Sequence, residues 1–244
     1  MFFITLLKEH HLLSLINSPF VISSFGTFQE ANSYTIILEH CDTDLGQWIS
    51  SRPYIPLPEL LTIFSQLSLA LVDVHNLGIL HRDIKCSNIF IHHPLQCKLG
   101  DFGISKLTDS SSTFVGTLNY MSPEVLQGQS YSNHADVYSL GVVLYKLIHN
   151  SLPVVSRSPL EIVSKIKNRE YCRTCKYDVL HQIVNLCLSC NPSERPSAET
   201  LVSLVRRARL LYQDEIDNVI EECSVEESIG DEIEDRFDLQ DESE

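Results

Sequence analysis

The sequence predicts an α+β fold in which a few strands come first and mainly helices follow. Two segments near the start, residues 20–28 and 34–39, have the composition of strands, and helical periodicity dominates after residue 132. Hydrophobic residues make up 43% of the 244-residue chain, which is enough for a packed core. Strands and helices that are segregated in this way are typical of an α+β architecture.

Local signals place the elements in order. Proline ends predicted helices because it cannot continue one, and glycine favours the left-handed turn that often closes a helix. Polar turns separate the predicted strands. The predicted elements are a helix over 5–17, strands over 20–28 and 34–39, a short helix over 45–51, a long amphipathic helix over 59–76 that Gly78 closes, two short strands on either side of His92, His93 and Pro94, a Ser- and Thr-rich loop over 105–118, and several helices after Ser132.

Acidic residues are concentrated at the end of the sequence. Residues 213–244 contain fifteen Asp and Glu residues and one base, Arg236, and so account for the whole formal net charge of −14. We expect this segment to be a disordered, solvated tail, or an electrostatic arm for a basic partner. Residues 1–212 are neutral, which disfavours non-specific binding to nucleic acid.

The sequence shows no signal for a membrane or for secretion. We find no apolar run that approaches the roughly 18 residues needed to span a membrane. The apolar start lacks the basic region and the cleavage site of a signal peptide. We therefore expect a cytoplasmic protein with no membrane contact.

Four of the eight cysteines have a spacing that resembles a zinc site. Cys172, Cys175, Cys187 and Cys190 form two C-x2-C pairs that eleven residues separate. The helical spacing of apolar residues over 179–188 predicts instead that Cys187 faces a core. We therefore favour ordinary core and surface thiols over zinc.

The densest polar cluster runs from His81 to Asn88 with the pattern H-R-D-x-K-x-x-N, and an apolar strand follows it. The tripeptide that begins at Asp101, D-F-G, comes thirteen residues after Asn88. Three further patterns follow in order, namely G-T-L-N-Y-M-S-P-E over 116–124, D-V-Y-S-L-G over 136–141, and Arg195-Pro196. In this order and spacing, the patterns resemble the eukaryotic protein kinases over about residues 5–212.

The resemblance implies a serine/threonine protein kinase that uses ATP and Mg²⁺ to phosphorylate Ser or Thr hydroxyls of protein substrates. It implies a protein kinase-like domain over 1–212, with a partial N-lobe over 1–40 and a complete, mainly helical C-lobe over 41–212. Asp83 is expected to orient the substrate hydroxyl and accept its proton, and Lys85 to stabilise the γ-phosphate. Asn88 and Asp101 would supply the hard oxygen ligands that Mg²⁺ prefers.

Other matching residues have structural or regulatory roles in the family. Removal of one partner of a buried ion pair strongly destabilises a protein. An arginine can bind the phosphate group of a phosphorylated loop residue. Thr113 is the phosphate acceptor that we expect, ahead of Ser110, Ser111 and Ser112. The residues with implied structural roles are His81 and Phe102 in the hydrophobic spine, Asp136 as the brace of the catalytic loop, Glu124 and Arg195 as the buried pair, and Arg82 as the phosphate receiver.

Within the superfamily, the sequence is similar to the NIMA-related (NEK) kinases and also to some STE-type kinases. T-F-V-G-T over 113–117 and Y-M-S-P-E over 120–124 are the basis of this similarity. By the same resemblance, Leu38 is the gatekeeper and the segment from Glu39 to Cys41 is the hinge whose backbone holds adenine. Asp44 is then a ribose contact.

The sequence departs from the family in its N-terminal part. None of the nine glycines forms G-x-G, so the sequence has no glycine-rich phosphate loop. No V-A-I-K-like strand precedes Glu9, which matches the family's αC glutamate. Ser24 stands where the spine has a large apolar residue, and Tyr138 replaces the usual Trp. We therefore expect an N-terminally truncated kinase domain that binds ATP weakly and transfers phosphate poorly.

Two other functions stay open from the sequence. The missing glycine loop favours a pseudokinase-like interaction module that uses the helical lobe and the acidic tail. A zinc-dependent module rests on the cysteine spacing alone. Conversely, the intact set of Asp83, Lys85, Asn88 and Asp101 favours a kinase, because a chain without a catalytic role has no physical need for all four.

Overall fold

The structure, a computed structural model, describes residues 2–30, 33–102, 117–172 and 177–213. The chain forms two compact units, Met1–Val205 and Arg206–Glu244. The first unit combines two small sheets with helices, so the predicted α+β class is confirmed. In the second unit, residues 206–213 are helical.

Two predictions fall outside the described residues. Thr113 and the neighbouring serines lie in residues 103–116, and almost all of the acidic segment lies in residues 214–244. The phosphate acceptor and the disordered tail therefore stay predictions, as do the domain boundaries at residues 212 and 213.

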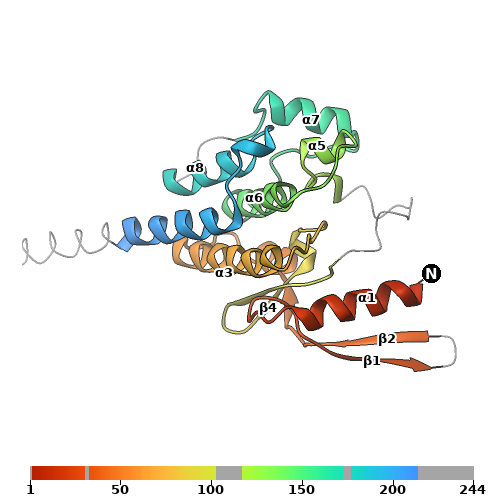
Figure 1. Cartoon of the computed structure of the whole chain (residues 1–244). Coiled ribbons are helices and arrows are strands. Elements are labelled where there is room, and N and C mark those ends of the chain that lie inside the picture. Colours follow the sequence, from red (N-terminus) through yellow and green to blue (C-terminus); the bar gives the residue numbers. More distant parts are fainter. Residues whose placement is uncertain (1, 31–32, 103–116, 173–176, 214–244) are drawn as a thin grey trace, which may run out of the picture. The chain divides into compact units, whose positions relative to one another are not determined.

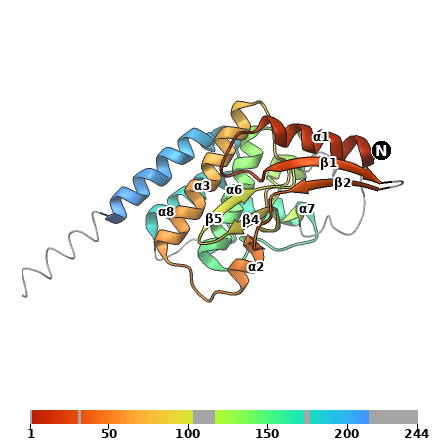
Figure 2. The same cartoon turned by 90° about the horizontal axis from the view of Figure 1, so that it is seen from below.

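The first helix packs against a two-stranded antiparallel sheet. Helix α1 (Phe2–Leu15) lies alongside strands β1 (Ser24–Glu30) and β2 (Ser33–Leu38) in Figures 1 and 2. Strand β1 begins later than the sequence predicted, because Val21 forms a parallel bridge with Leu99 of another sheet instead of joining the hairpin. The segment between α1 and β1 therefore links the two sheets.

The second sheet has the order β3-β4-β5, and its neighbouring strands are antiparallel. Its strands are β3 (Thr43–Asp44), β4 (Ile89–His92) and β5 (Gln96–Leu99), so the two short strands predicted around residues 92–94 are confirmed. Helix α3 (Leu57–Asn76) packs against β5. This sheet holds the segment after residue 88 in a fixed register.

Helix α3 forms much of the core, and Gly78 ends it with φ +71°, the left-handed conformation that glycine adopts without strain. It begins two residues earlier than predicted, because Pro58 is compatible with the first turn of a helix.

Among the described residues, α3 is the one helix that is long and apolar enough to cross a membrane, and 56% of its apolar window is buried. The sequence prediction that no apolar stretch approaches the length of a membrane span is therefore wrong for α3. Tertiary packing explains the composition of α3, because it is a core helix.

Helix α6 (Asn133–His149) is the centre of the helical part, and it contacts both α3 and α8 (Figure 1). Asn150 closes α6 in the left-handed conformation, with φ +52°. Most side chains of α6 are buried, including the large ring of Tyr138 at 1% exposure. The other short elements of this part are α2 (Leu45–Ser50), η1 (Cys86–Asn88), α5 (Pro123–Leu126), α7 (Pro159–Lys167), α8 (Asp178–Cys187) and η2 (Pro192–Glu194).

The cysteines follow the core interpretation where the structure describes them. Cys187 is fully buried, as its helical position predicted, whereas Cys172 and Cys190 are exposed. Cys175 lies outside the described residues. Within the described ranges, no group of three or more His, Cys, Asp and Glu side chains could hold a metal ion.

Gly141 lets α6 and α8 approach closely. A methyl group at position 141 would overlap the Cβ atom of Cys187. We therefore expect Gly141→Ala to lower the free energy of unfolding by about 1–3 kcal/mol, the usual cost of overpacking a core. Urea denaturation followed by circular dichroism measures this change.

Two variants control for other causes. Ser164→Ala, on the exposed face of α7, should leave the midpoint of unfolding unchanged. Cys187→Gly removes the clashing atom. The double variant Gly141→Ala/Cys187→Gly should therefore lose less free energy of unfolding than the two single variants lose together. Additive losses would show that the contact is not the cause.

Candidate active site

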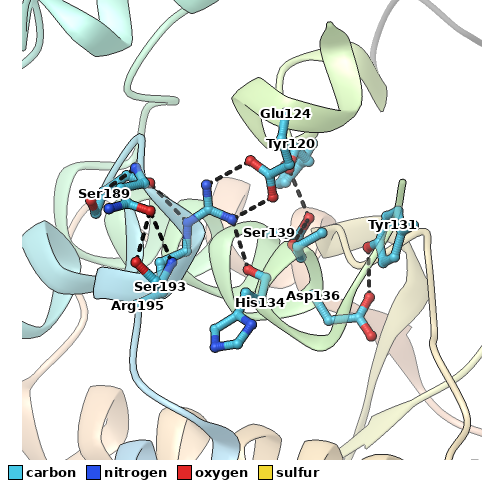
Figure 3. Close-up of polar contacts among 11 residues, drawn as sticks. Tyr120, Glu124, Tyr131, His134, Asp136, Ser139, Ser189, Ser193 and Arg195 are labelled. Atoms are coloured by element: carbon cyan, nitrogen blue, oxygen red, sulfur yellow. Dashed lines mark hydrogen bonds and ion pairs between the residues drawn. The ribbon is translucent and has the colours of Figure 1, made fainter. Parts of the chain in front are cut away.

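The catalytic-loop motif is built on one buried carboxylate, that of Asp136 in the first turn of α6. Its Oδ2 accepts hydrogen bonds from His81 N (3.0 Å) and His75 Nε2 (2.9 Å). Its Oδ1 accepts from Arg82 N (3.0 Å) and the Tyr131 hydroxyl (2.6 Å; Figure 3). Burial raises the pKa of Asp136, but these hydrogen bonds outweigh it, and the pKa lies below its ordinary value.

One of the residues that Asp136 contacts, Arg82, has a strained backbone conformation. Arg82 has φ +68°, a left-handed conformation that costs a non-glycine residue free energy. The hydrogen bond from Arg82 N to Asp136 Oδ1 compensates for this cost. The side chains on either side of Arg82 thereby take fixed directions.

His81 connects the catalytic loop to the D-F-G segment. Its Nδ1 accepts from Asp83 N (3.2 Å), so its Nε2 carries the proton that it donates to Gly100 O (3.0 Å). Burial lowers the pKa of His81, which keeps the ring neutral at neutral pH and preserves this tautomer. The ring centroid lies 4.6 Å from that of Phe102.

Asp83, Lys85 and Asn88 form one hydrogen-bonded cluster. Asp83 Oδ2 accepts from Lys85 Nζ (2.9 Å) and from Asn88 Nδ2 (2.9 Å). Asn88 Nδ2 also donates to Asp83 O (2.9 Å), and Lys85 Nζ donates to the hydroxyl of Thr117 (3.2 Å). Asp83 and Asn88 are buried, whereas Lys85 is partly exposed. The cluster therefore places a buried carboxylate next to a partly exposed ammonium group.

Asp101 lies on a segment that is hydrogen-bonded to this cluster through the neighbouring residue, Gly100. Gly100 N donates to Asn88 O (3.0 Å), which joins the residue before Asp101 to the end of the catalytic motif. A Cβ atom at position 100 would lie 2.8 Å from the ring of Phe90, so the chain needs glycine for this approach. Asp101 itself has φ +55°.

The amide oxygen of Asn88 and the carboxylate of Asp101 are hard oxygen donors held on neighbouring, hydrogen-bonded segments. Mg²⁺ prefers such donors, and it takes few of them from protein because it keeps waters and phosphate oxygens. The residues present therefore fit the ion.

The predicted hinge residues lie on the connection from β2 to α2. Leu38 ends β2 and is 39% exposed. The carboxylate of Glu39 contacts Lys98 Nζ at 3.0 Å, and Cys41 is half-buried. Asp44 caps α2, because its Oδ1 accepts from Gln47 N at 3.0 Å. The structure thus gives Asp44 a structural role that the predicted ribose contact did not include.

Glu124 and Arg195 form a buried bidentate ion pair (Figure 3). The guanidinium donates to the two carboxylate oxygens at 2.6 and 2.7 Å, and it also donates to the carbonyls of His134 and Ser189. It lies over the ring of Tyr138, with its carbon 5.0 Å from the ring centre. Burial raises the pKa of Glu124, but the hydrogen bonds from Arg195 outweigh it, so the pKa is lowered overall.

Near Glu9, a half-buried residue of α1, the structure has a polar contact that the sequence did not predict. His10 Nδ1 lies 2.7 Å from the hydroxyl of Ser24. Ser24, the polar residue at an apolar family position, therefore has a hydrogen-bonding partner on α1.

Sequence reasoning also missed three residues that support the site. His75 and Tyr131 complete the hydrogen bonding of Asp136, and Lys98 contacts Glu39. A histidine in the last turn of an apolar helix was a usable signal for His75. Lys98 could not be recognised from the local sequence, because its partner Glu39 is distant in the chain. Tyr131 lies only five residues before Asp136, so their contact was within reach of local reasoning.

The Glu124–Arg195 pair yields a prediction about stability and pH. Glu124→Gln should lower the free energy of unfolding by about 3 kcal/mol at pH 7, because it leaves a buried guanidinium without its counter-charge. The lowered pKa means that the contribution of Glu124 is present above the ordinary value of 4.5 and is lost as the pH falls through the folded-state value. The free energy of unfolding should therefore depend less on pH below 4.5 in the variant than in the wild type. Denaturant titrations between pH 3 and 7 measure both effects.

Glu161→Gln is the matched control, because Glu161 also pairs with a base, Lys165, but on the exposed face of α7. It should leave the unfolding midpoint at pH 7 nearly unchanged. Equal losses in the two variants would contradict the importance of burial for the Glu124–Arg195 pair.

Comparison with known proteins agrees with this geometry. The family model described as "Protein kinase domain" matches residues 4–204. Human serine/threonine-protein kinase Nek5 is 34% identical over 205 residues, and mouse Nek3 is 35% identical over 207 residues. Rat NUAK family SNF1-like kinase 2 is 31% identical over 201 residues. Each alignment covers 80% of this chain but only 29%, 40% and 32% of the respective relative.

The motif order, the geometry around Asp83 and these relatives lead to one family assignment. The chain belongs to the protein kinase family, and it is similar to the NIMA-related serine/threonine kinases within it.

Proposed function

We propose that this chain contains the catalytic part of a serine/threonine protein kinase that transfers the γ-phosphoryl group of ATP to Ser or Thr hydroxyls of proteins. The observation that supports this most strongly is the cluster of Asp83, Lys85 and Asn88, which hydrogen bonds through Gly100 to the segment of Asp101. A carboxylate, an ammonium group and two hard oxygen donors are the groups that phosphoryl transfer requires.

Each residue has a defined task in this proposal. The substrate hydroxyl oxygen attacks the γ-phosphorus, the bond from that phosphorus to the ADP oxygen breaks, and Asp83 accepts the hydroxyl proton. Lys85 stabilises the charge on the transferred group, and its contact with the Thr117 hydroxyl at 3.2 Å supports a preference for Ser and Thr substrates. When bound, Mg²⁺ would neutralise phosphate charge, and Asn88 and Asp101 are the residues that would hold it.

The expected activity of this sequence by itself is weak. It has no glycine-rich loop and no V-A-I-K-like strand, which position the β- and γ-phosphates in the family. Misplaced phosphates reduce the rate steeply, because the reaction depends on positioning. A pseudokinase-like interaction module, which uses the helical part and the acidic segment, is therefore the second candidate, and the missing loop is the observation that favours it.

The binding partners and the cellular location of the chain also belong to this proposal. The neutral body is not suited to non-specific nucleic-acid binding, and the acidic residues 213–244 suit a basic protein partner. A cytoplasmic location without membrane contact is likewise part of this proposal.

A phosphorylation assay tests the catalytic proposal. The full chain should transfer labelled phosphate from Mg·ATP to casein or to a Ser/Thr peptide library at a low rate, and Asp83→Asn should reduce this rate at least about 100-fold. Asp178→Asn, an equivalent change at an exposed position in the first turn of α8, should not alter it.

Three outcomes distinguish the candidates. Transfer that Asp83→Asn abolishes supports the kinase. Transfer that survives Asp83→Asn contradicts the role of Asp83. No transfer, together with partner binding that survives both Asp83→Asn and Asp101→Asn, supports the interaction module. Mass spectrometry of the native protein would show in parallel whether peptides with a glycine-rich loop and a lysine-bearing strand precede residue 1.

A further inference from the structure

Lys98 is a buried lysine, although this residue type is almost never buried without a partner. Its side chain is only 6% exposed. It lies in β5, where it is opposite Phe90 of β4. Its ammonium group lies 3.0 Å from Glu39 Oε2 and donates to Pro19 O at 3.0 Å. Lys98 therefore joins three segments that are distant in sequence.

Glu39 is restrained on its backbone as well as on its side chain. Its amide donates to Ser23 O (2.9 Å), and its Oε2 accepts from Ser23 N (3.2 Å) in return. Burial raises the pKa of Glu39, but the hydrogen bond from Lys98 and further contacts outweigh it, so the pKa is lowered. The carboxylate is thus charged at neutral pH and holds a fixed direction toward β5.

The same strand leads to the candidate metal ligand. Lys98 precedes Asp101 by three residues, and the residues between them are also held. Leu99 exchanges backbone hydrogen bonds with Phe20 and Ile22, at 2.8 and 2.9 Å. Gly100 is bonded to Asn88 and His81. A shift of β5 at Lys98 would therefore be transmitted to Asp101.

We propose that Lys98 is a positioning residue that locks the segment Glu39–Cys41 to the strand that presents Asp101, and so sets the affinity for nucleotide. This inference rests on the proposed function, with Asp101 as a ligand of the Mg²⁺ that accompanies ATP and, as the family resemblance implies, the backbone of Glu39–Cys41 as the adenine-binding hinge. Lys98 acts through Glu39 and β5 and does not itself contact the nucleotide.

The test uses the full chain and the variant Lys98→Met, which keeps the length of the side chain but removes its charge. The first measurement is the dissociation constant of Mg·ATP by titration calorimetry, well below the unfolding temperature. The second measurement is the hydrogen-exchange rate of the Glu39 amide without nucleotide. We expect affinity to fall about tenfold and exchange to accelerate about tenfold or more, the scale of one lost charge-assisted hydrogen bond.

Matched variants separate positioning from general stability. Lys165→Met removes a half-exposed lysine that pairs with Glu161 and should change neither quantity. Glu39→Gln should weaken Mg·ATP binding to a similar extent, and its effect should not add to that of Lys98→Met, because both remove one contact. Should Lys98→Met fail to fold, Glu39→Gln, which preserves the side-chain shape, tests the same contact.

Each outcome decides the inference. Unchanged affinity and unchanged Glu39 exchange in the folded variants would overturn it, and so would a lowered unfolding temperature without either change. If the wild type binds no Mg·ATP, nucleotide binding under the proposed function fails, and so does the claim that Lys98 sets affinity. The exchange rate then decides separately whether Lys98 holds the segment.

Discussion

The arrangement of the site depends on a single buried charge, the carboxylate of Asp136. A buried carboxylate is costly unless donors surround it, and here a histidine ring, a tyrosine hydroxyl and two backbone amides satisfy it. The two amides belong to His81 and Arg82, so the charge determines the path of the chain just before Asp83. Without the carboxylate oxygens of Asp136 as acceptors, the left-handed conformation of Arg82 would have little to stabilise it.

Neutral hydrogen bonds extend this order from Asp136 to the segment of Asp101, the proposed metal ligand. His81 donates to Gly100 O and accepts from Asp83 N, so one neutral ring orients both the catalytic loop and the segment before Asp101. A charged imidazole could not accept from Asp83 N, which makes burial of the ring a condition of the arrangement. The small size of Gly100 then permits the contact with Phe90 and brings Asp101 to Asn88.

The other buried charges have separate tasks. Arg195 and Glu124 hold α5 to η2 and α6, and loss of either partner would leave an uncompensated buried charge. Lys98 and Glu39 join the end of β2 to β5. Charged pairs therefore connect segments that hydrophobic packing alone would leave free to slide, and the apolar helices α3 and α6 provide the frame on which these pairs act.

How much could be predicted from the sequence differs between elements and contacts. Helices α2 and α3 and strands β4 and β5 follow from local periodicity, and Cys187 could be placed in a core from its helical position. The start of β1 could not be predicted, because Val21 has a β-forming side chain whose partner, Leu99, lies in another sheet.

The sequence by itself determined the family, through motifs that follow the order of the protein kinases, and it predicted Asp83, Lys85, Asn88 and Asp101 as the proposed reacting set. Only the tertiary structure decided what holds them, because His75 and Lys98 contact residues that are distant in the chain, and Tyr131 reaches Asp136 across the start of α6. It also gave Asp44 a capping role. Local patterns report which conformations a segment favours, whereas the donors that satisfy a buried charge are chosen by which segments the fold brings together.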